Sequence, residues 1–274
     1  MKYYDRKIYK EIKLESYSEK TNKIENTNII YNKSSENMEE IPENSIHLII
    51  TSPPYNVGKE YDQDLSLNEY FEFLERVFLE CKRVLIPGGK LCINIIAIGR
   101  KPYIPLHHYL STLLINNGLY MLGEIIWNKS TSGGGSSSTA WGSWMSPSSP
   151  CLREIHESIL IFSKGNQSLK GNKEDIDITK EEFLEYTKSI WNIRTENSKS
   201  NPHPAPFPEE LPSRLIKLYT YKGNIVLDPF MGGGSTSIAA INLNRKYIGY
   251  ETNPEYCEMI KERIYNLSKK KKLF

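Results

Sequence analysis

The sequence lacks the usual signals of metal binding, disulfide bonding and membrane insertion. Its four cysteines are widely spaced and form no Cys-x-x-Cys pair, so neither a zinc site nor a disulfide framework is expected. No apolar run approaches the roughly 20 residues that cross a bilayer, and residues 1–7 lack the apolar core of a signal peptide. We therefore expect a cytoplasmic protein without a resident metal.

The sequence also has little excess of either charge. Its 35 Lys and Arg residues against 33 Asp and Glu residues give a formal net charge of +2, which permits a nucleic-acid partner without requiring one. At 274 residues, the chain is long enough for one α/β domain with a large core and too short for two. We expect an N-terminal extension over residues 1–27, a single domain over 28–262, and a basic tail over 263–274.

Apolar runs and helical patterns alternate along this domain. Strands are predicted over residues 28–31, 46–51, 91–96, 119–127, 224–228 and 247–250 and in the apolar run that ends the stretch 153–162. Helices are predicted over 37–41, 67–85, 106–116 and from 209 onward. Such alternation favours a mostly parallel sheet with helices on both faces.

A Ser-Pro-Pro-Tyr segment, residues 52–55, directly follows the apolar run 46–51. Proline has no amide hydrogen, so the pair ends the strand abruptly and holds Ser52, the Pro53 carbonyl and the Tyr55 ring in one arrangement. Open α/β sheets place their chemistry at the carboxyl ends of strands. The tetrapeptide alone is weakly specific, because a structural loop with a packed tyrosine has the same sequence.

A second segment, residues 224–236, reads as a strand, a turn with three glycines and a helix start. Glycines let the backbone approach a ligand, and the free amides of the helix favour its negative end. The segment has no Gly-Lys-Ser/Thr and no Gly-x-Gly-x-x-Gly, which disfavours phosphate binding. Glu251 follows the next strand, about twenty residues later, where a carboxylate can accept hydrogen bonds from both ribose hydroxyls.

Both segments resemble motifs of one family, the amino-methyltransferases of DNA. Residues 52–55 resemble its Ser/Asp/Asn-Pro-Pro-Tyr/Phe catalytic motif, and the Asp-Pro-Phe-x-Gly-x-Gly pattern at 228–234 resembles its S-adenosylmethionine loop. The catalytic motif comes first, which is the circularly permuted order of the β group. The resemblance implies a Rossmann-like α/β fold with a mostly parallel seven-stranded sheet. It divides the domain into a catalytic half (28–162), a small target-recognition region (about 163–200) and a cofactor half (201–262).

The resemblance also implies roles for individual residues. The catalytic set is Ser52, Pro53, Pro54 and Tyr55. The S-adenosylmethionine set is Asp228, Pro229, Phe230, Gly232, Gly234, Ser235, Thr236 and Glu251, with Pro206 and Phe207 from a proline-rich segment. The candidates for contact with DNA or the base are Asn56, Lys59, Trp141, Trp144 and Arg153. The family places an acidic residue near the cofactor adenine, but residues 32–35 read Asn-Lys-Ser-Ser, so this contact is unassigned.

Two tryptophans follow a Gly/Ser-rich stretch, residues 130–139. Flexible backbone with aromatic faces suits a loop that covers an extruded base, although a plain linker has the same composition. Cys151 lies in a Ser-Pro-Cys-Leu context that does not match the Pro-Cys-Gln type motif of C5-cytosine methyltransferases. The bases of interest are therefore those methylated on an exocyclic amine.

The predicted function is site-specific methyl transfer from S-adenosylmethionine to N4 of a flipped cytosine in duplex DNA. Within the family, Ser-Pro-Pro-Tyr tends to accompany N4-cytosine and Asp-Pro-Pro-Tyr N6-adenine, so adenine is the alternative. A non-catalytic DNA-binding module that retains the fold, and methylation of RNA or of a protein amide, are further alternatives. A restriction-modification or epigenetic setting, a cognate endonuclease and a homodimer are all compatible with the resemblance.

Overall fold

The computed structural model describes residues 7–10, 17, 20–55, 64–99, 102–129, 150, 152, 154–165, 168–195 and 207–271. Its strands are β1 (Ile29–Tyr31), β2 (Ile46–Thr51), β3 (Leu85–Ile95), β4 (Tyr120–Asn128), β5 (His156–Ser163), β6 (Ile190–Asn192), β7 (Ile225–Asp228) and β8 (Lys246–Tyr250). Its helices are α1 (Lys7–Lys10), α2 (Leu67–Val84), α3 (Leu106–Asn116), α4 (Lys180–Tyr186), α5 (Glu210–Tyr219), α6 (Ser235–Asn242) and α7 (Pro254–Lys271), with a 3-10 turn at Lys173–Asp175.

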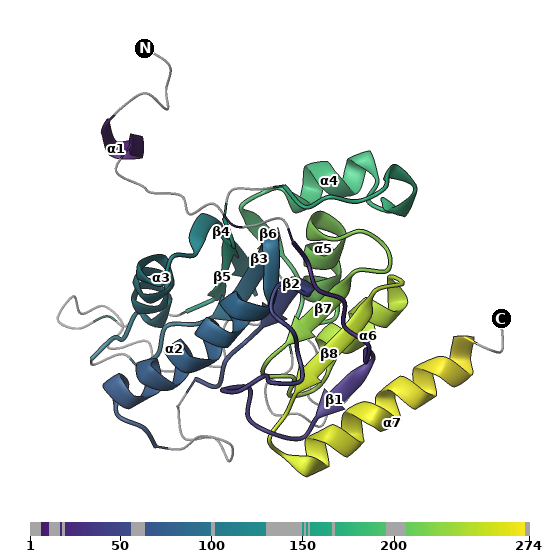
Figure 1. Ribbon diagram of the computed structural model, residues 1–274. Helices are drawn as coiled ribbons and strands as arrows, with labels where there is room; N and C mark the ends of the chain where they lie inside the picture. The colour runs from purple at the N-terminus through teal and green to yellow at the C-terminus, as the bar shows by residue number, and fades with distance from the viewer. Residues whose placement is uncertain are drawn as a thin grey trace.

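The described strands form one eight-stranded sheet in the order β1-β8-β7-β2-β3-β5-β4-β6 (Figure 1). Every neighbouring pair is parallel except the two that involve β5, which runs antiparallel to both β3 and β4. The mostly parallel α/β fold predicted from the sequence is therefore confirmed. The strand beyond the seven expected is not identified by the sequence patterns, because β6 has only three residues and lies in a polar stretch.

Side chains alternate between two apolar layers, one on each face of the sheet. In β2, Ile49 packs into the layer that contains residues of α2 and α3, whereas Leu48 and Ile50 pack into the layer of α5, α6 and α7. This two-residue period is the geometry of a strand buried on both faces, and it explains why β2 is nearly all apolar in sequence.

Helix α2 begins and ends for local reasons. Ser66 and Glu69 form a capping box that satisfies the first free amides of the helix. The helix predicted over residues 67–85 ends at Val84, and residues 87–89 lie inside β3, which begins before the predicted strand 91–96. A Cβ on Gly89 would lie 2.9 Å from the His47 carbonyl oxygen, so glycine allows the irregular part of β3 to approach β2.

The helix predicted over residues 37–41 is wrong, because these residues form turns. The Arg83 guanidinium donates to the carbonyl oxygens of Met38 (2.9 Å) and Ile41 (3.0 Å), and the Glu80 carboxylate accepts from the Met38 amide (2.8 Å). The side chains of α2 thus satisfy backbone groups of this non-helical segment.

The C-terminal end of the described chain differs from the expected tail. Helix α7 continues through Lys271, so the basic segment that was expected to begin at residue 263 starts inside a helix. None of the helices in the described part of the chain is both long and apolar enough to span a membrane.

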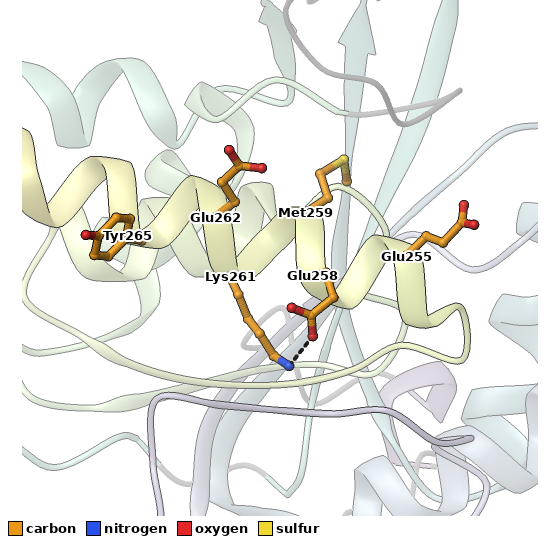
Figure 2. Close-up of a pocket in the computed structure, with 6 residues that line it drawn as sticks. All are labelled: Glu255, Glu258, Met259, Lys261, Glu262 and Tyr265. Atoms are coloured by element: carbon orange, nitrogen blue, oxygen red, sulfur yellow. Dashed lines mark hydrogen bonds and ion pairs between the residues drawn. The ribbon is translucent and has the colours of Figure 1, made fainter.

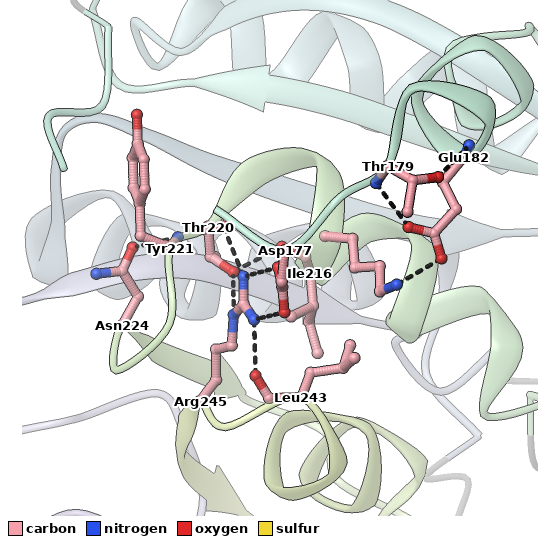
Figure 3. A network of polar contacts seen from close by, with 10 residues as sticks. Asp177, Thr179, Glu182, Ile216, Thr220, Tyr221, Asn224, Leu243 and Arg245 are labelled. Atoms are coloured by element: carbon pink, nitrogen blue, oxygen red, sulfur yellow. Dashed lines mark hydrogen bonds and ion pairs between the residues drawn. The ribbon is translucent and has the colours of Figure 1, made fainter. Parts of the chain in front are cut away.

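The buried Arg245, which directly precedes β8, pairs with Asp177 in the segment before α4 (Figure 3). The Arg245 guanidinium pairs with both carboxylate oxygens of Asp177 and also donates to Thr220 Oγ1 (2.9 Å), the Thr220 carbonyl (2.8 Å) and the Leu243 carbonyl (2.6 Å). The Arg245 side chain is fully buried and the Asp177 side chain is 17% exposed. The region expected to recognise the target is therefore anchored to the cofactor half by a satisfied ion pair.

Arg245→Ala is expected to lower the free energy of unfolding by about 3–5 kcal/mol, because Asp177 would keep a largely buried charge without its partner. Urea unfolding measures the change. Lys188→Ala, which removes an exposed pair with Glu185, is the control and should change stability by no more than about 0.5 kcal/mol. Equal losses in the two variants would contradict the structural role of the buried pair.

His47 in β2 should make stability depend on pH. Burial lowers its pKa to about 4 from 6.5, and its Nδ1 accepts from the Ile225 amide at 3.3 Å, which requires a neutral ring. A depressed folded-state pKa means that the stability is complete above pH 6.5 and is lost as pH falls towards 4.

Between about pH 7.5 and about pH 5, the wild type should therefore lose about 1–2 kcal/mol more stability than His47→Asn, which retains an acceptor but does not titrate. Urea unfolding at both pH values checks this. Parallel pH profiles of the two proteins would show that His47 does not titrate on unfolding as expected.

Candidate active site

The Ser-Pro-Pro-Tyr segment and the glycine turn line the same cavity. Its volume is about 450 Å³, and it is bordered by residues 52–55, by 229–233 with Ser235, and by Glu251. These segments follow β2, β7 and β8, which are parallel neighbours, so their carboxyl ends meet at one edge of the sheet. The cavity lies where open α/β sheets bind ligands.

The buried Asp228 carboxylate joins the two segments. It accepts from Thr51 Oγ1 (2.8 Å) at the end of β2, and from Thr236 Oγ1 (2.7 Å) and the Phe230 amide (3.1 Å) on its own side. Burial raises the pKa of Asp228 to about 6, and the three hydrogen bonds oppose that rise. Asp228, Gly234 and Thr236, all expected to hold the cofactor, are absent from the lining of the cavity and instead shape the turn.

Glu251 fixes the backbone of the glycine turn beside the cavity. Its carboxylate accepts from the Gly232 amide and from the Asn253 amide, both at 2.8 Å. Burial raises the pKa of Glu251, and these backbone hydrogen bonds oppose the rise. Gly234 has φ +76°, and a Cβ there would lie 2.7 Å from Ile260, so this position excludes other residues.

Ser235, the first residue of α6, has an unused polar atom in the cavity wall. Its Oγ is buried and has no hydrogen-bond partner among the described residues. Phe207, Pro229 and Phe230 supply apolar surface nearby, and the Phe230 ring lies 5.9 Å from that of Phe73 in α2. A buried hydroxyl without a partner is costly in a folded protein, which makes Ser235 a candidate for a ligand contact once its side chain rotates towards the cavity.

Tyr55 lies at the centre of a polar cluster. Its Oη is 2.8 Å from Ser52 Oγ and 3.3 Å from both Glu157 Oε2 and Asn94 Nδ2. The Tyr70 hydroxyl donates to the Pro54 carbonyl at 2.8 Å and fixes the backbone of the proline pair. Burial, with a further contribution from Glu157, raises the pKa of Tyr55 well above its usual value, so the phenol stays protonated.

Several predicted contacts lie outside the described residues. These are Asn56, Lys59, Trp141, Trp144, Arg153 and Pro206, together with Cys151 and the Gly/Ser-rich stretch 130–139. Their assignments stay predictions. In the described part of the chain, no group of three or more His, Cys, Asp or Glu side chains is placed to hold a metal ion.

Sequence reasoning missed part of the cavity wall. The loop after β1 contributes residues 33–36, and Glu36 accepts from Arg76 at 2.8 Å and from Ser34 at 2.9 Å. The stretch in which an acidic residue was expected, residues 32–35, ends one position before this carboxylate. Residues 69, 70, 72 and 73 of α2 also line the cavity, and none of them was among the predicted site residues.

A second hollow, of about 710 Å³, lies on the surface of α7 (Figure 2). It is bordered by Glu255, Glu258, Met259, Lys261, Glu262 and Tyr265, all from this helix, and includes the Glu258–Lys261 ion pair at 2.6 Å. No residue of the two motif segments borders it. An open hollow on one helix lacks converging groups from other elements, so it is not a candidate active site.

Known proteins resemble the chain over most of its length. A family model described as DNA methylase, for N6 and N4 methyltransferases, matches residues 46–262. Type II methyltransferase M.HpaI of Haemophilus parainfluenzae is 35% identical over 245 residues, covering 83% of this chain and 70% of that protein. Type II methyltransferase M.MjaI of Methanocaldococcus jannaschii is 32% identical over 268 residues, covering 83% and 88%.

Solved structures share the fold. The putative DNA modification methylase TTHA0409 of Thermus thermophilus is 31% identical with a TM-score of 0.70, over 85% of this chain and 92% of that one. PvuII DNA methyltransferase, described as cytosine-N4-specific, has a TM-score of 0.67 over 90% and 89%, but at 21% identity it bears on the fold alone. Extended sequence identity, a shared fold and a family match from β2 to α7 establish that this chain belongs to the N6/N4 family of DNA methylases.

Proposed function

We propose that the protein transfers the methyl group of S-adenosylmethionine to the exocyclic N4 of a cytosine flipped out of duplex DNA. The observation that carries the proposal is the single cavity shared by Ser52 and the glycine turn with Glu251. The order of these segments along the chain supports membership of the β group. Type II methyltransferases among the relatives support a role in a restriction-modification system.

The cavity suits S-adenosylmethionine, which was bound in one crystal structure of TTHA0409, a protein 31% identical to this chain. Glu251 retains acceptor capacity for ribose hydroxyls, the orphaned Ser235 hydroxyl offers a polar contact, and Phe230 offers apolar surface. The cofactor supplies a methyl group on a sulfonium, which is already a good electrophile.

The protein's task is to present the amine of the base correctly. The lone pair of an exocyclic amine is delocalised into the ring, so the amine is a poor nucleophile. Acceptors aimed at its two hydrogens, Ser52 Oγ and the Pro53 carbonyl, favour a pyramidal nitrogen whose lone pair points at the methyl group. A serine hydroxyl is too weakly basic to remove the proton early, so proton loss accompanies or follows transfer.

Tyr55 would offset part of the cost of base flipping. Extruding a base costs a few kcal/mol, and stacking on an aromatic ring contributes about 1–3 kcal/mol.

The preference for cytosine rests on serine at position 52, since the family motif with aspartate tends to accompany adenine. Adenine N6 is the second candidate. The same proposal includes duplex DNA as the substrate, recognised by residues 163–200 and by the candidate DNA contacts. It also includes a cognate endonuclease, a homodimer and a cytoplasmic location.

The product identifies the base. Duplex DNA treated with the protein and S-adenosylmethionine, then digested to nucleosides, should contain N4-methylcytosine by mass spectrometry. Ser52→Ala should lower the rate of methyl transfer roughly 100-fold or more without changing thermal stability. Only N6-methyladenine in the digest would refute the cytosine assignment. DNA binding by a folded wild type without any methyl transfer would favour the non-catalytic module.

Two neighbouring serines of α6 test the cofactor site. Ser235→Ala should weaken S-adenosylmethionine binding about 5- to 10-fold, because the cofactor would lose its contact with the orphaned hydroxyl. Ser237 is also buried, but its Oγ donates to the Gly234 carbonyl at 2.7 Å, so Ser237→Ala should reduce stability and leave the affinity unchanged. Calorimetry measures both affinities. Unchanged affinity in Ser235→Ala would place the cofactor elsewhere.

A further inference from the structure

Two residues outside both motif segments, Asn94 and Glu157, contact the Tyr55 hydroxyl, and a third, Lys129, pairs with Glu157. Asn94 lies in β3, Glu157 lies in β5, and Lys129 directly follows β4. Glu157 Oε1 pairs with Lys129 Nζ at 2.7 Å, and Glu157 Oε2 accepts from Asn94 Nδ2 and lies 3.3 Å from Tyr55 Oη. The Glu157 side chain is 11% exposed.

The antiparallel direction of β5 brings Glu157 to this position. In its register, Ser158 pairs with Ile95, the last residue of β3, and Glu157 pairs with Trp127 of β4. The amino end of β5 therefore meets the carboxyl ends of β2 and β3. A parallel strand in the same place would put its amino end at the opposite edge of the sheet.

The donors and acceptors of the cluster determine the direction of its hydrogen bonds. A carboxylate only accepts, so Asn94 presents its amide nitrogen to Glu157, and the Tyr55 hydroxyl directs its single hydrogen to Glu157 Oε2. Either hydroxyl could donate in the 2.8 Å contact between Tyr55 and Ser52, and with the Tyr55 hydrogen on Glu157 the hydrogen of Ser52 makes this contact. With that hydrogen engaged, the lone pairs of Ser52 Oγ remain for another donor.

We propose that Glu157 is a positioning residue that acts through Tyr55 to make Ser52 a hydrogen-bond acceptor towards the amine of the target base. This role rests on the proposed function and holds for cytosine and adenine alike, because both present an amine. Without the carboxylate, Tyr55 can donate to Ser52, whose own hydrogen is then free to point at the amine and oppose its binding geometry. Lys129 offsets the cost of burying the Glu157 charge.

A double-mutant cycle tests this role. Single-turnover methyl transfer is measured for the wild type, Glu157→Gln, Tyr55→Phe and the double variant at saturating S-adenosylmethionine. Glu157→Gln, which keeps the side-chain size, should slow transfer about 10- to 100-fold and leave cofactor affinity unchanged. In the Tyr55→Phe background the same change should alter the rate by less than about 2-fold, because the connecting hydroxyl is gone.

Glu80→Gln is the matched control, because it neutralises a partly buried carboxylate that pairs with Arg83 and does not border the cavity. Its rate should equal that of the wild type. If Glu157→Gln does not fold, Lys129→Met/Glu157→Gln replaces it, since this pair leaves no unpaired cation.

An unchanged rate in Glu157→Gln, or the same slowing in the Tyr55→Phe background, would overturn the positioning role while leaving the proposed function intact. Absence of methyl transfer by the wild type on DNA would overturn the proposed function and this role together.

Discussion

The active-site architecture depends on one buried carboxylate. Asp228 accepts from hydroxyls at the end of β2 and the start of α6, and from the amide of Phe230. Thr51 directly precedes Ser52, so this set of bonds sets the distance between the segment that would receive the base and the turn that would hold the methyl donor. Burying a carboxylate is unfavourable unless its oxygens are paired, which makes the arrangement specific as well as rigid.

The sheet provides the frame for this connection. Strands β2, β7 and β8 are central and parallel, with apolar layers on both faces, so their carboxyl ends cannot shift independently. Loops at this edge carry both polar and apolar residues, whereas the strands beneath them are buried. The chemistry is therefore placed on short connections between rigid elements, which suits a reaction that depends on alignment more than on acid or base strength.

Three carboxylates at this edge act differently. Asp228 faces donors from its own fold on every described contact and stabilises the geometry of the turn. Glu157 contacts the Tyr55 hydroxyl, and in the proposed role the direction of these hydrogen bonds decides which atoms Ser52 offers to a ligand. A third, Glu251, faces the cavity itself. All three carboxylates lie at the carboxyl edge of the sheet, and the groups that each one contacts decide its role.

The amino-acid sequence by itself determined the local elements: the apolar strands, the capped helix α2, and the two motif segments with their turn chemistry. These depend on neighbouring residues and on periodicity, so they can be read along the chain. Tertiary structure alone decided which groups meet across long separations. Residues 37–41 form turns that bond to Arg83 instead of the predicted helix, and the three-residue β6 pairs at the edge of the sheet. Strand β5 runs antiparallel to its neighbours, which places Glu157 within 3.3 Å of Tyr55, 102 residues away. Such pairings depend on where the whole chain packs, which no local pattern encodes.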